Sequence, residues 1–402
     1  MLKTIEAVVA GHLCLDIFPD LRQLPKGEFT FLFQPGHLIE VGPAILSTGG
    51  SVSNTGLALH KLGIGTQLMG KVGADRFGQA VLDIVRSHGN ELGSGMVVDA
   101  ESNTSYTIAI NPPGLDRIFL HCPGANNTFR AADIRYDLVQ DARLFHFGYP
   151  PLMRHLFADA GSELVEMFRR VNQSGVTTSL DMVYPDPASA AGKVDWKGIL
   201  QKTLPFVDVF LPSLEELMIM VRPELYARWL YEAGDARQTM ITVELLRELA
   251  EELIAQGVAI AGLKMGDRGL YVRTAGSTRL KEMGQACPKD CQAWADRELW
   301  ATCFEVEVMG TTGAGDATIA GFLAALLKGM GPERAMTAAV AVGGCCVEAA
   351  DALGGLRCWD ETMERVEQGW LRKPMKSPAP GWVWNDAHQV WIGSVGTCPR
   401  QP

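Results

Sequence analysis

Short apolar segments that fit β-strands alternate with helix-like segments along this 402-residue chain. Residues 177–181, 207–211 and 258–264 are three such strand-like segments, and amphipathic stretches lie between them. Alternation of this kind is typical of a parallel sheet with helices on both faces. The sequence therefore predicts an α/β protein, one large three-layer αβα unit with a mostly parallel central sheet. A hydrophobic content of 47% is ample for a sizeable core.

A loop of small residues precedes an apolar helix in the C-terminal third of the chain. The loop is Gly-Thr-Thr-Gly-Ala-Gly-Asp, residues 310–316, and apolar side chains recur at helical spacing after it. A helix N-terminus has free backbone N–H groups that bind an anion, and small residues let a phosphate approach closely. The loop is therefore a candidate phosphate site.

Asp316 ends this loop, where its carboxylate would repel a bound phosphate. Such a carboxylate calls for another task, and accepting the proton of a hydroxyl that attacks phosphorus is the obvious one. The alternative is an aspartate that only caps the helix.

Two N-terminal segments carry further candidate site residues. Residues 47–63 predict a turn at Gly49 and Gly50, then a helix with Asn54 in its first turn. The amide of Asn54 could bond sugar hydroxyls or cap the helix. Residues 8–16 predict an apolar strand that ends at Asp16. A carboxylate at a strand end lies where α/β sheets bind ligands, although a solvated aspartate that closes the strand fits equally well.

Together these three segments resemble the PfkB, or ribokinase-like, family of carbohydrate kinases. The resemblance runs through most of residues 5–370 in the family's order of motifs. Gly49-Gly50-x-x-x-Asn54 fits the N-terminal signature, and residues 312–316 match the C-terminal signature, which is the most specific element. Similar strings lie at residues 70–78, 123–126 and 145–149.

The resemblance implies ATP-dependent phosphoryl transfer to a hydroxyl of a sugar or sugar-like substrate. Asp316 would be the catalytic base, and the anion hole would be formed by the amides of Gly313, Ala314 and Gly315. The residues that would hold the sugar are Asp16, Gly49, Gly50 and Asn54. The positions on the nucleotide side are Thr312, Lys264, Gly266 and Gly269. Mg²⁺ would accompany ATP, with Glu216 as its carboxylate.

The chain departs from the family pattern at two places. Gly310 stands where the family usually has an aspartate, which in some members helps to bind a monovalent cation, so such a site is in doubt here. Ser213 replaces the asparagine of the family's Pro-Asn-x-x-Glu string, although Glu216 is kept. Neither change touches the proposed base.

The resemblance also divides the chain into parts. Residues 1–370 would form the kinase domain, with lid segments at about 16–42 and 96–121. In the family such strands form a small β lid over the sugar and often make a dimer contact, which implies a possible homodimer. Arg117, on the returning lid strand, could reach a charged substrate or remain a solvated edge charge.

Two further segments lie outside the familiar pattern. An insertion at about 274–302 precedes the C-terminal signature, and from there it could shape the nucleotide pocket. It holds Cys287 and Cys291, but with Cys303 these make only three thiols with no histidine nearby, which argues against a zinc site. The C-terminal extension, residues 371–402, contains several tryptophans and is expected to pack on the body.

Composition narrows the partners and the compartment. A net charge of −10 without a long basic cluster argues against nucleic acid or an anionic membrane as a partner. Nine cysteines without a regular framework indicate a reducing compartment. No apolar run approaches the ~18 residues of a spanning helix. A soluble cytoplasmic enzyme is therefore expected.

Three functions remain open from the sequence. The leading one is a kinase for a sugar or sugar acid, and a nucleoside kinase on the same fold is its nearest rival. A sensor that binds a sugar or nucleotide without catalysis is the rival from another class. Asp181, at the end of the strand 177–181, is a further site candidate or a turn-forming aspartate.

Overall fold

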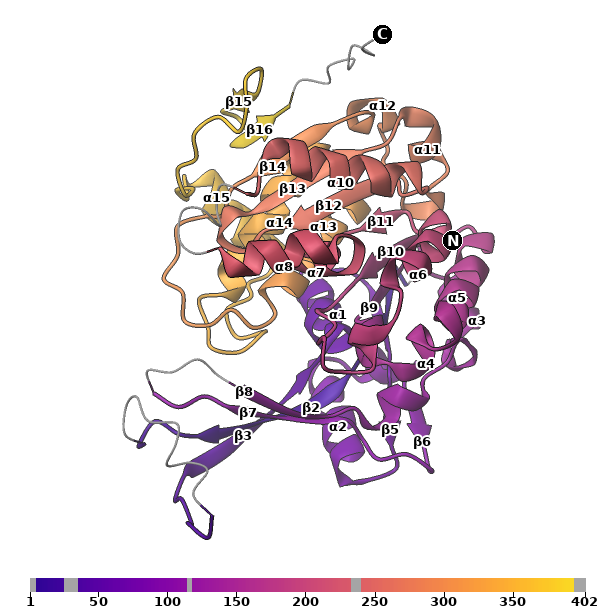
Figure 1. Ribbon diagram of the computed structural model, residues 1–402, viewed down its shortest axis with the longest axis vertical. Helices are drawn as coiled ribbons and strands as arrows, with labels where there is room; N and C mark the ends of the chain where they lie inside the picture. Colours follow the sequence, from indigo (N-terminus) through magenta and orange to yellow (C-terminus); the bar gives the residue numbers. More distant parts are fainter. Residues whose placement is uncertain (1–4, 25–34, 114–117, 233–239, 394–402) are drawn as a thin grey trace.

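The computed structural model describes residues 5–24, 35–113, 118–232 and 240–393. Its main sheet has ten strands in the order β15-β16-β14-β13-β12-β11-β10-β9-β1-β4 (Figure 1). The parallel strands are β4 (Thr66–Met69), β1 (Ala7–Gly11), β9 (Leu144–Gly148), β10 (Thr177–Asp181), β11 (Val209–Phe210) and β12 (Ile260–Lys264). The antiparallel strands are β13 (Leu270–Thr274), β14 (Glu298–Ala301), β16 (Val390–Ile392) and β15 (Val383–Asn385).

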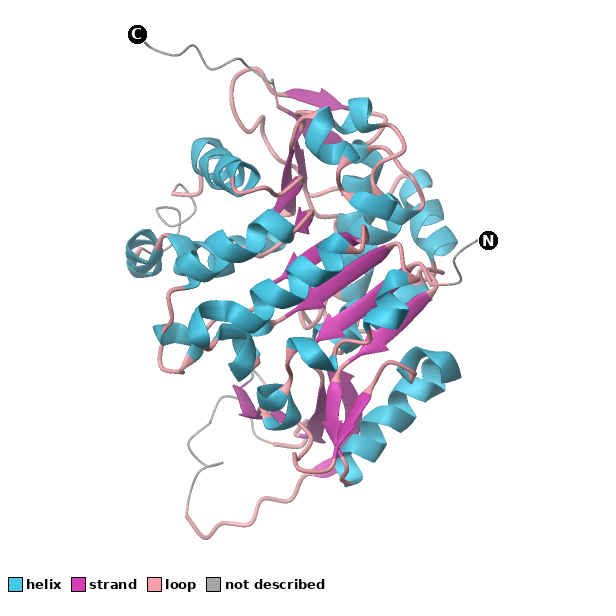
Figure 2. Ribbon diagram, turned by 90° about the vertical axis from the view of Figure 1, so that its right-hand side faces the viewer, coloured by secondary structure: helices cyan, strands magenta, loops and turns pink. Residues whose placement is uncertain are grey.

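Helices cover both faces of this sheet, as Figure 2 shows. Alternate residues of β1 enter different cores: Ala7 and Val9 pack with α1, α13 and α14, whereas Val8 and Ala10 pack with α5, α6 and α10. This alternation follows from the two-residue period of a strand. The longer helices are α1 (Ser51–Lys61), α2 (Arg76–His88), α5 (Ser162–Gln173), α6 (Trp196–Thr203), α7 (Leu214–Val221), α8 (Pro223–Tyr231), α10 (Val243–Ala255), α13 (Ala314–Leu327), α14 (Pro332–Cys346) and α15 (Trp359–Glu367). The predicted α/β fold is confirmed.

A second sheet forms the predicted lid, which projects from the lower end of the molecule in Figure 1. Its strands, in the order β3-β2-β7-β8, are β3 (Gly42–Gly49), β2 (Cys14–Asp20), β7 (Tyr106–Ile110) and β8 (Ile118–Cys122). The predicted bounds were wrong at two places. The lid continues through β3 to Gly49, and β6 (Val97–Asp99) leaves it to pair with β5 (Lys71–Gly73). The first bound was wrong because β3, a lid strand, leads directly into the turn before α1.

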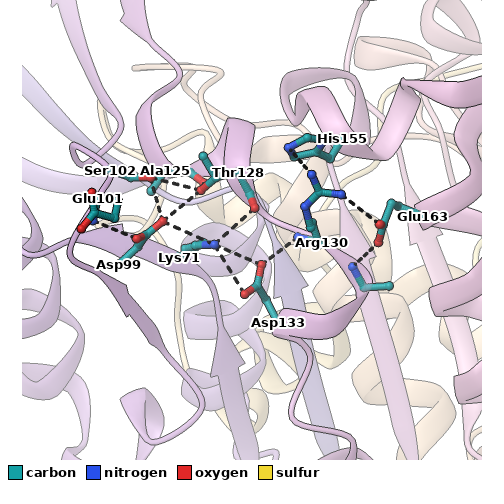
Figure 3. Close-up of polar contacts among 11 residues, drawn as sticks. Lys71, Asp99, Glu101, Ser102, Ala125, Thr128, Arg130, Asp133, His155 and Glu163 are labelled. Atoms are coloured by element: carbon teal, nitrogen blue, oxygen red, sulfur yellow. Dashed lines mark hydrogen bonds and ion pairs between the residues drawn. The ribbon is translucent and has the colours of Figure 1, made fainter.

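The string at residues 70–78 forms the base of the β5–β6 pair and lies outside the cavity of the candidate site. Lys71 Nζ lies 3.5 Å from Asp99 Oδ2 and 3.3 Å from Asp133 Oδ2 (Figure 3). The same ammonium donates to the carbonyl oxygen of Thr128 at 3.2 Å. These contacts fasten the small sheet to the loop that follows the lid strand β8.

The insertion at 274–302 packs into the protein interior. It includes the short helices α11 (Ser277–Lys281) and α12 (Cys291–Trp294), and Trp294 and Trp300 are at most 2% exposed. The residues that line the large cavity described below include none from this insertion, so the expectation that it shapes the pocket was wrong. Within the described ranges, no cluster of three or more His, Cys, Asp or Glu is placed to hold a metal.

The extension after residue 370 packs on the body, as expected, and it lengthens the main sheet. Strand β16 pairs with β14, and β15 pairs with β16 (Figure 1). Trp382 is 6% exposed and belongs to the core on the α10 face. Among the helices of the described ranges, none is long and apolar enough to cross a bilayer.

Glu298 on β14 supplies a test of the contacts that hold this end of the main sheet. Its buried carboxylate accepts bonds from the Tyr271 hydroxyl at 2.8 Å and from Arg247 Nε at 3.0 Å. We expect Glu298→Ala to lower the free energy of unfolding by about 3 kcal/mol, because it leaves a buried hydroxyl and a guanidinium without their acceptor. Urea denaturation would measure the change. Glu251→Ala, which removes an exposed partner of Arg273, should cost less than about 1 kcal/mol, and equal losses would contradict the assignment.

Candidate active site

Asp316 lies in the first turn of α13 and is 2% exposed. The residue before the helix, Gly313, has a φ of 75°, and a Cβ there would lie 2.4 Å from the Cβ of Ala352. Only glycine fits this left-handed position. Gly313, Ala314, Gly315 and Asp316 all line one cavity of about 450 Å³. The predicted anion hole and the predicted base are therefore neighbours at the same helix start.

Three side chains donate hydrogen bonds to the Asp316 carboxylate. Asn54 Nδ2 and the Tyr149 hydroxyl donate to Oδ2 at 3.0 and 2.7 Å, and Thr55 Oγ1 donates to Oδ1 at 3.2 Å. Asn54 and Thr55 come from α1, and Tyr149 follows β9. This arrangement fixes the direction of the carboxylate from both sides. Asp316 is therefore more than a helix cap.

Asn54 differs from the expectation that both ends of its amide meet the sugar. Its nitrogen is bonded to Asp316, whereas its buried Oδ1 has no hydrogen-bond partner among the described residues. Buried polar atoms rarely lack a partner in native proteins. The free oxygen is thus an acceptor available to a ligand hydroxyl.

Tyr149 was not predicted as a site residue. Its backbone has a φ of 67°, which is uncommon outside glycine, and its N–H donates to the Asp181 carbonyl at 3.3 Å. Burial and the nearby Asp316 carboxylate raise the pKa of Tyr149 well above its usual value. The hydroxyl therefore stays protonated and donates a hydrogen bond to Asp316. The string at residues 145–149 was noticed in the sequence, but nothing in it indicates that the chain turns the ring toward residue 316.

The two glycines of the predicted turn are required by close neighbours. A Cβ on Gly49 would lie 2.1 Å from Asp16 Oδ2, and one on Gly50, whose φ is 89°, would lie 2.5 Å from the His12 carbonyl oxygen. The structure thus brings Asp16, Gly49 and Gly50 together below α1. Burial raises the pKa of Asp16, whose Oδ1 accepts a bond from Cys14 Sγ at 3.2 Å. Arg117 lies outside the described residues.

His12 is a second residue that sequence reasoning missed. It is 2% exposed, and within the described ranges neither ring nitrogen has a hydrogen-bond partner. Burial and then His121 lower its pKa to about 3, so the imidazole is neutral and offers one donor and one acceptor. Its ring centroid lies 5.3 Å from that of His121 in the lid and 6.3 Å from that of Tyr149. The signal in the sequence that could have identified His12 is its position as a polar residue at the end of an apolar strand.

Three of the predicted nucleotide residues line the same cavity. Lys264, Gly266 and Gly269 line it, and Lys264 Nζ lies 2.6 Å from Asp181 Oδ1. Burial raises the pKa of Asp181, and although burial alone would lower the pKa of Lys264, the neighbouring carboxylates raise it. Asp181 therefore belongs to the site. The lining includes Thr311 but not Thr312, whose carbonyl accepts a bond from Cys346 Sγ at 3.5 Å.

Glu216 lines the same cavity, and its carboxylate forms a capping box with Ser213 at the N-terminus of α7. Its Oε2 accepts the Ser213 N–H at 2.7 Å, and Ser213 Oγ accepts the Glu216 N–H at 3.2 Å. Ser213 therefore replaces the family's asparagine as a working cap. Without a cluster of metal-binding side chains in the described ranges, Mg²⁺ fits here only with phosphates and water as its main ligands, and Glu216 would be the available carboxylate.

Gly310 explains the other departure from the family pattern. A Cβ on this residue would lie 2.9 Å from the carbonyl oxygens of both Ala349 and Ala350. An aspartate at this position would have to push that backbone away. The surroundings of Gly310 are therefore built for glycine.

His146, beneath the cavity, predicts a pH dependence of stability. It is fully buried on β9, with Nδ1 3.0 Å from Ser179 Oγ, and burial with the nearby Lys264 lowers its pKa to about 3. Below pH 6.5 the unfolded chain binds a proton that the folded chain excludes, so stability is lost as pH falls toward 3. Between pH 6.5 and 4.5, His146→Asn should lose about 2 kcal/mol less than the unmodified protein.

Urea denaturation at both pH values would measure this difference. His37→Asn, the same change at an exposed histidine, should keep the original pH dependence. An unchanged slope in His146→Asn would show that His146 takes up a proton in the folded state.

Comparison with known proteins gives the family. The family model described as "pfkB family carbohydrate kinase" matches residues 29–356. An uncharacterised sugar kinase of Archaeoglobus fulgidus is 25% identical over 300 residues, which cover 75% of this chain and 98% of that protein. The structure resembles Arabidopsis thaliana ribokinase complexed with ribose and ATP, with a TM-score of 0.64, 19% identity and coverage of 90% and 98%.

A nucleoside kinase of Methanocaldococcus jannaschii shares the fold, with a TM-score of 0.59, 19% identity and coverage of 90% and 99%. At such identities these two structures establish the fold alone. The family model spans most of the chain and agrees with the sugar-kinase relative. This protein belongs to the pfkB family of carbohydrate kinases.

Proposed function

We propose that Asp316 is the general base in the transfer of the γ-phosphoryl group of ATP to a sugar hydroxyl. One observation carries the proposal: a buried carboxylate, held by three donors, lies at a helix N-terminus between the sugar-side groups and the nucleotide-side cavity. A carboxylate that only capped α13 would have no need of donors from α1 and from the end of β9.

The reaction follows from this placement. The acceptor hydroxyl gives its proton to Asp316 while its oxygen forms a bond to the γ-phosphorus, and the bond from phosphorus to the bridging oxygen of ADP breaks. The amides of Gly313, Ala314 and Gly315 stabilise the charge on the migrating group. One preorganised donor of this kind contributes about 3 kcal/mol in other enzymes. The products are a sugar phosphate and ADP.

Tyr149 and Asn54 position the base for this step. Both donate to Oδ2 of Asp316, whereas Oδ1 accepts one bond, from Thr55, and keeps a lone pair for the acceptor hydroxyl. The hydrogen bonds keep the carboxylate in one orientation, which shortens the search for the reactive geometry. Tyr149 is therefore a positioning residue and leaves proton acceptance to Asp316.

Three polar side chains bind the hydroxyl groups of the sugar. They are the carboxylate of Asp16, the amide of Asn54 through its free Oδ1, and the neutral imidazole of His12 through its unpartnered nitrogens. His121 belongs to the lid strand β8 and contacts His12, so the lid and the sugar site meet at these two rings. Movement of the lid toward the body would exclude water that could otherwise accept the phosphoryl group.

The nucleotide occupies the cavity that Asp316 helps to line. Lys264, Gly266 and Gly269 lie along it, and its apolar part, which includes Val306, Val340 and Val347, accepts the flat base. Thr312 does not line the cavity, and its carbonyl oxygen accepts a bond from Cys346. Mg²⁺ neutralises the phosphates when it is bound, with Glu216 as the protein carboxylate.

The proposed site of action is the cytoplasm. All eight cysteines in the described ranges are free thiols, as proteins of a reducing compartment usually have.

An acceptor panel with a coupled assay for ADP tests the function. We expect turnover with neutral sugars or sugar acids and not with nucleosides, and Asp316→Asn should reduce kcat by ~10²–10⁴-fold while sugar binding survives, because the variant cannot accept the proton. Asp141→Asn, an exposed change, should leave kcat unaltered. Near-normal turnover in Asp316→Asn would remove Asp316 from its role. Ligand binding without ADP release on any acceptor would favour a sensor.

The lid also supports the proposal of a homodimer. Ile45 and Leu46 on β3 and Phe119 and Leu120 on β8 are 49–66% exposed, an unusual concentration of large apolar side chains on one small sheet. Because neighbouring residues of a strand alternate, Ile45 and Phe119 lie on one face of this sheet, and Leu46 and Leu120 lie on the other. A second copy of the lid would cover the face that carries Ile45 and Phe119.

Light scattering after size exclusion would measure the assembly. We expect a dimer for the unmodified protein and a monomer for the double variant Ile45→Glu with Phe119→Glu, because charges would face the partner lid. Leu230→Glu, which alters an equally exposed leucine on α8, should leave the dimer intact. A monomeric unmodified protein would refute the proposal.

A further inference from the structure

The segment just after residue 370 runs along the wall of the nucleotide cavity, beyond the residues 29–356 that the family model covers. The Glu305 N–H donates to the Leu371 carbonyl at 2.8 Å, and the Lys373 N–H donates to the Cys303 carbonyl at 2.8 Å. Between them Phe304 and Arg372 form an antiparallel bridge. The extension is thus attached by backbone bonds to a wall of the site.

This pairing decides which side chains face the cavity. Neighbouring residues of a paired strand point to opposite faces, so Cys303 and Lys373 share the face opposite to that of the Phe304–Arg372 pair. Both residues line the cavity, and Cys303 Sγ lies 3.3 Å from the Gly266 carbonyl oxygen. Lys373 therefore stands close to the glycine loop on the nucleotide side.

Arg372 anchors the segment from its other face. Its Nη1 donates to the Thr302 carbonyl at 2.6 Å and its Nη2 to Thr337 Oγ1 at 2.9 Å. Its guanidinium carbon lies 4.3 Å from the centre of the Phe304 ring, which stacks on Trp370 at 4.3 Å and 18°. These contacts hold the backbone of Lys373 in place.

The charged side chains along the cavity provide Lys373 with no ion-pair partner among the described residues. The carboxylates in the lining are those of Asp181, Glu216, Asp267 and Asp316. Two lysines oppose them, and Lys264 is already paired with Asp181 at 2.6 Å. Within the described ranges, Lys373 takes part in no ion pair. A polyphosphate entering this acidic cavity would therefore find in Lys373 a cation whose charge is free for it.

We propose that Lys373 binds the polyphosphate of the nucleotide, so that the C-terminal extension completes the nucleotide site. The proposal rests on the assignment of this cavity to ATP. It adds to the proposed function a binding residue that lies outside the matched family region.

Titration calorimetry tests the role of Lys373. It measures the Kd of ATP, ADP and adenosine for the full chain in the absence of an acceptor. In Lys373→Gln we expect the Kd for ATP and for ADP to rise about tenfold, as for the loss of one hydrogen bond to a charged group. The Kd for adenosine should stay the same, because adenosine carries no phosphate. Lys373→Arg should restore ATP binding to within about threefold, since it keeps the charge.

Lys376→Gln is the matched control, because Lys376 is an exposed lysine three residues along that does not line the cavity. It should bind all three ligands normally. An ATP Kd within twofold of the unmodified protein in Lys373→Gln would overturn the proposal, and so would an equal loss of adenosine binding. A chain that phosphorylates no acceptor but loses ATP binding in Lys373→Gln would refute the proposed function and leave this inference standing.

Discussion

The Asp316 carboxylate is the point at which the separate parts of this kinase meet. Taking a carboxylate out of water is costly unless hydrogen bonds replace those to water. Here Asn54, Thr55 and Tyr149 replace them, and α13 offers its positive end to the same group. Helix α1, the end of β9 and the small-residue loop before α13 are therefore tied together by one charge. Disturbing any of them changes the direction of the proposed base.

The sequence predicted which residues form this candidate site better than it predicted the contacts between them. The small-residue loop, the Gly49–Gly50 turn and the aspartate follow from local patterns, and the strand–helix alternation gave the fold class. The bond from Asn54 to Asp316 spans 262 positions and depends on how α1 packs on α13. The left-handed backbone of Tyr149 and the burial of His12 likewise arise only in the folded chain.

The errors have physical reasons of the same kind. The lid bounds were wrong because β3 is a lid strand and also leads to the glycine turn, which no change in composition marks. The insertion at 274–302 seemed to face the nucleotide from its position in sequence, but Trp294 and Trp300 turn into the core. Aromatic residues can cover a ligand or fill an interior, and only the packing partners decide between the two.

The pairing of the extension with the cavity wall has a consequence for synthesis on the ribosome. Strand β14 gains its neighbour β16, and residue 303 gains its partner at 373, only when the chain beyond residue 372 has emerged. A nascent chain that stops earlier leaves a bare sheet edge, which invites association with other strands. Its small-residue loop before α13 would already be complete, yet the wall of the cavity beside that loop would lack residues 371–373. The cavity thus takes its full shape only after this segment has been translated.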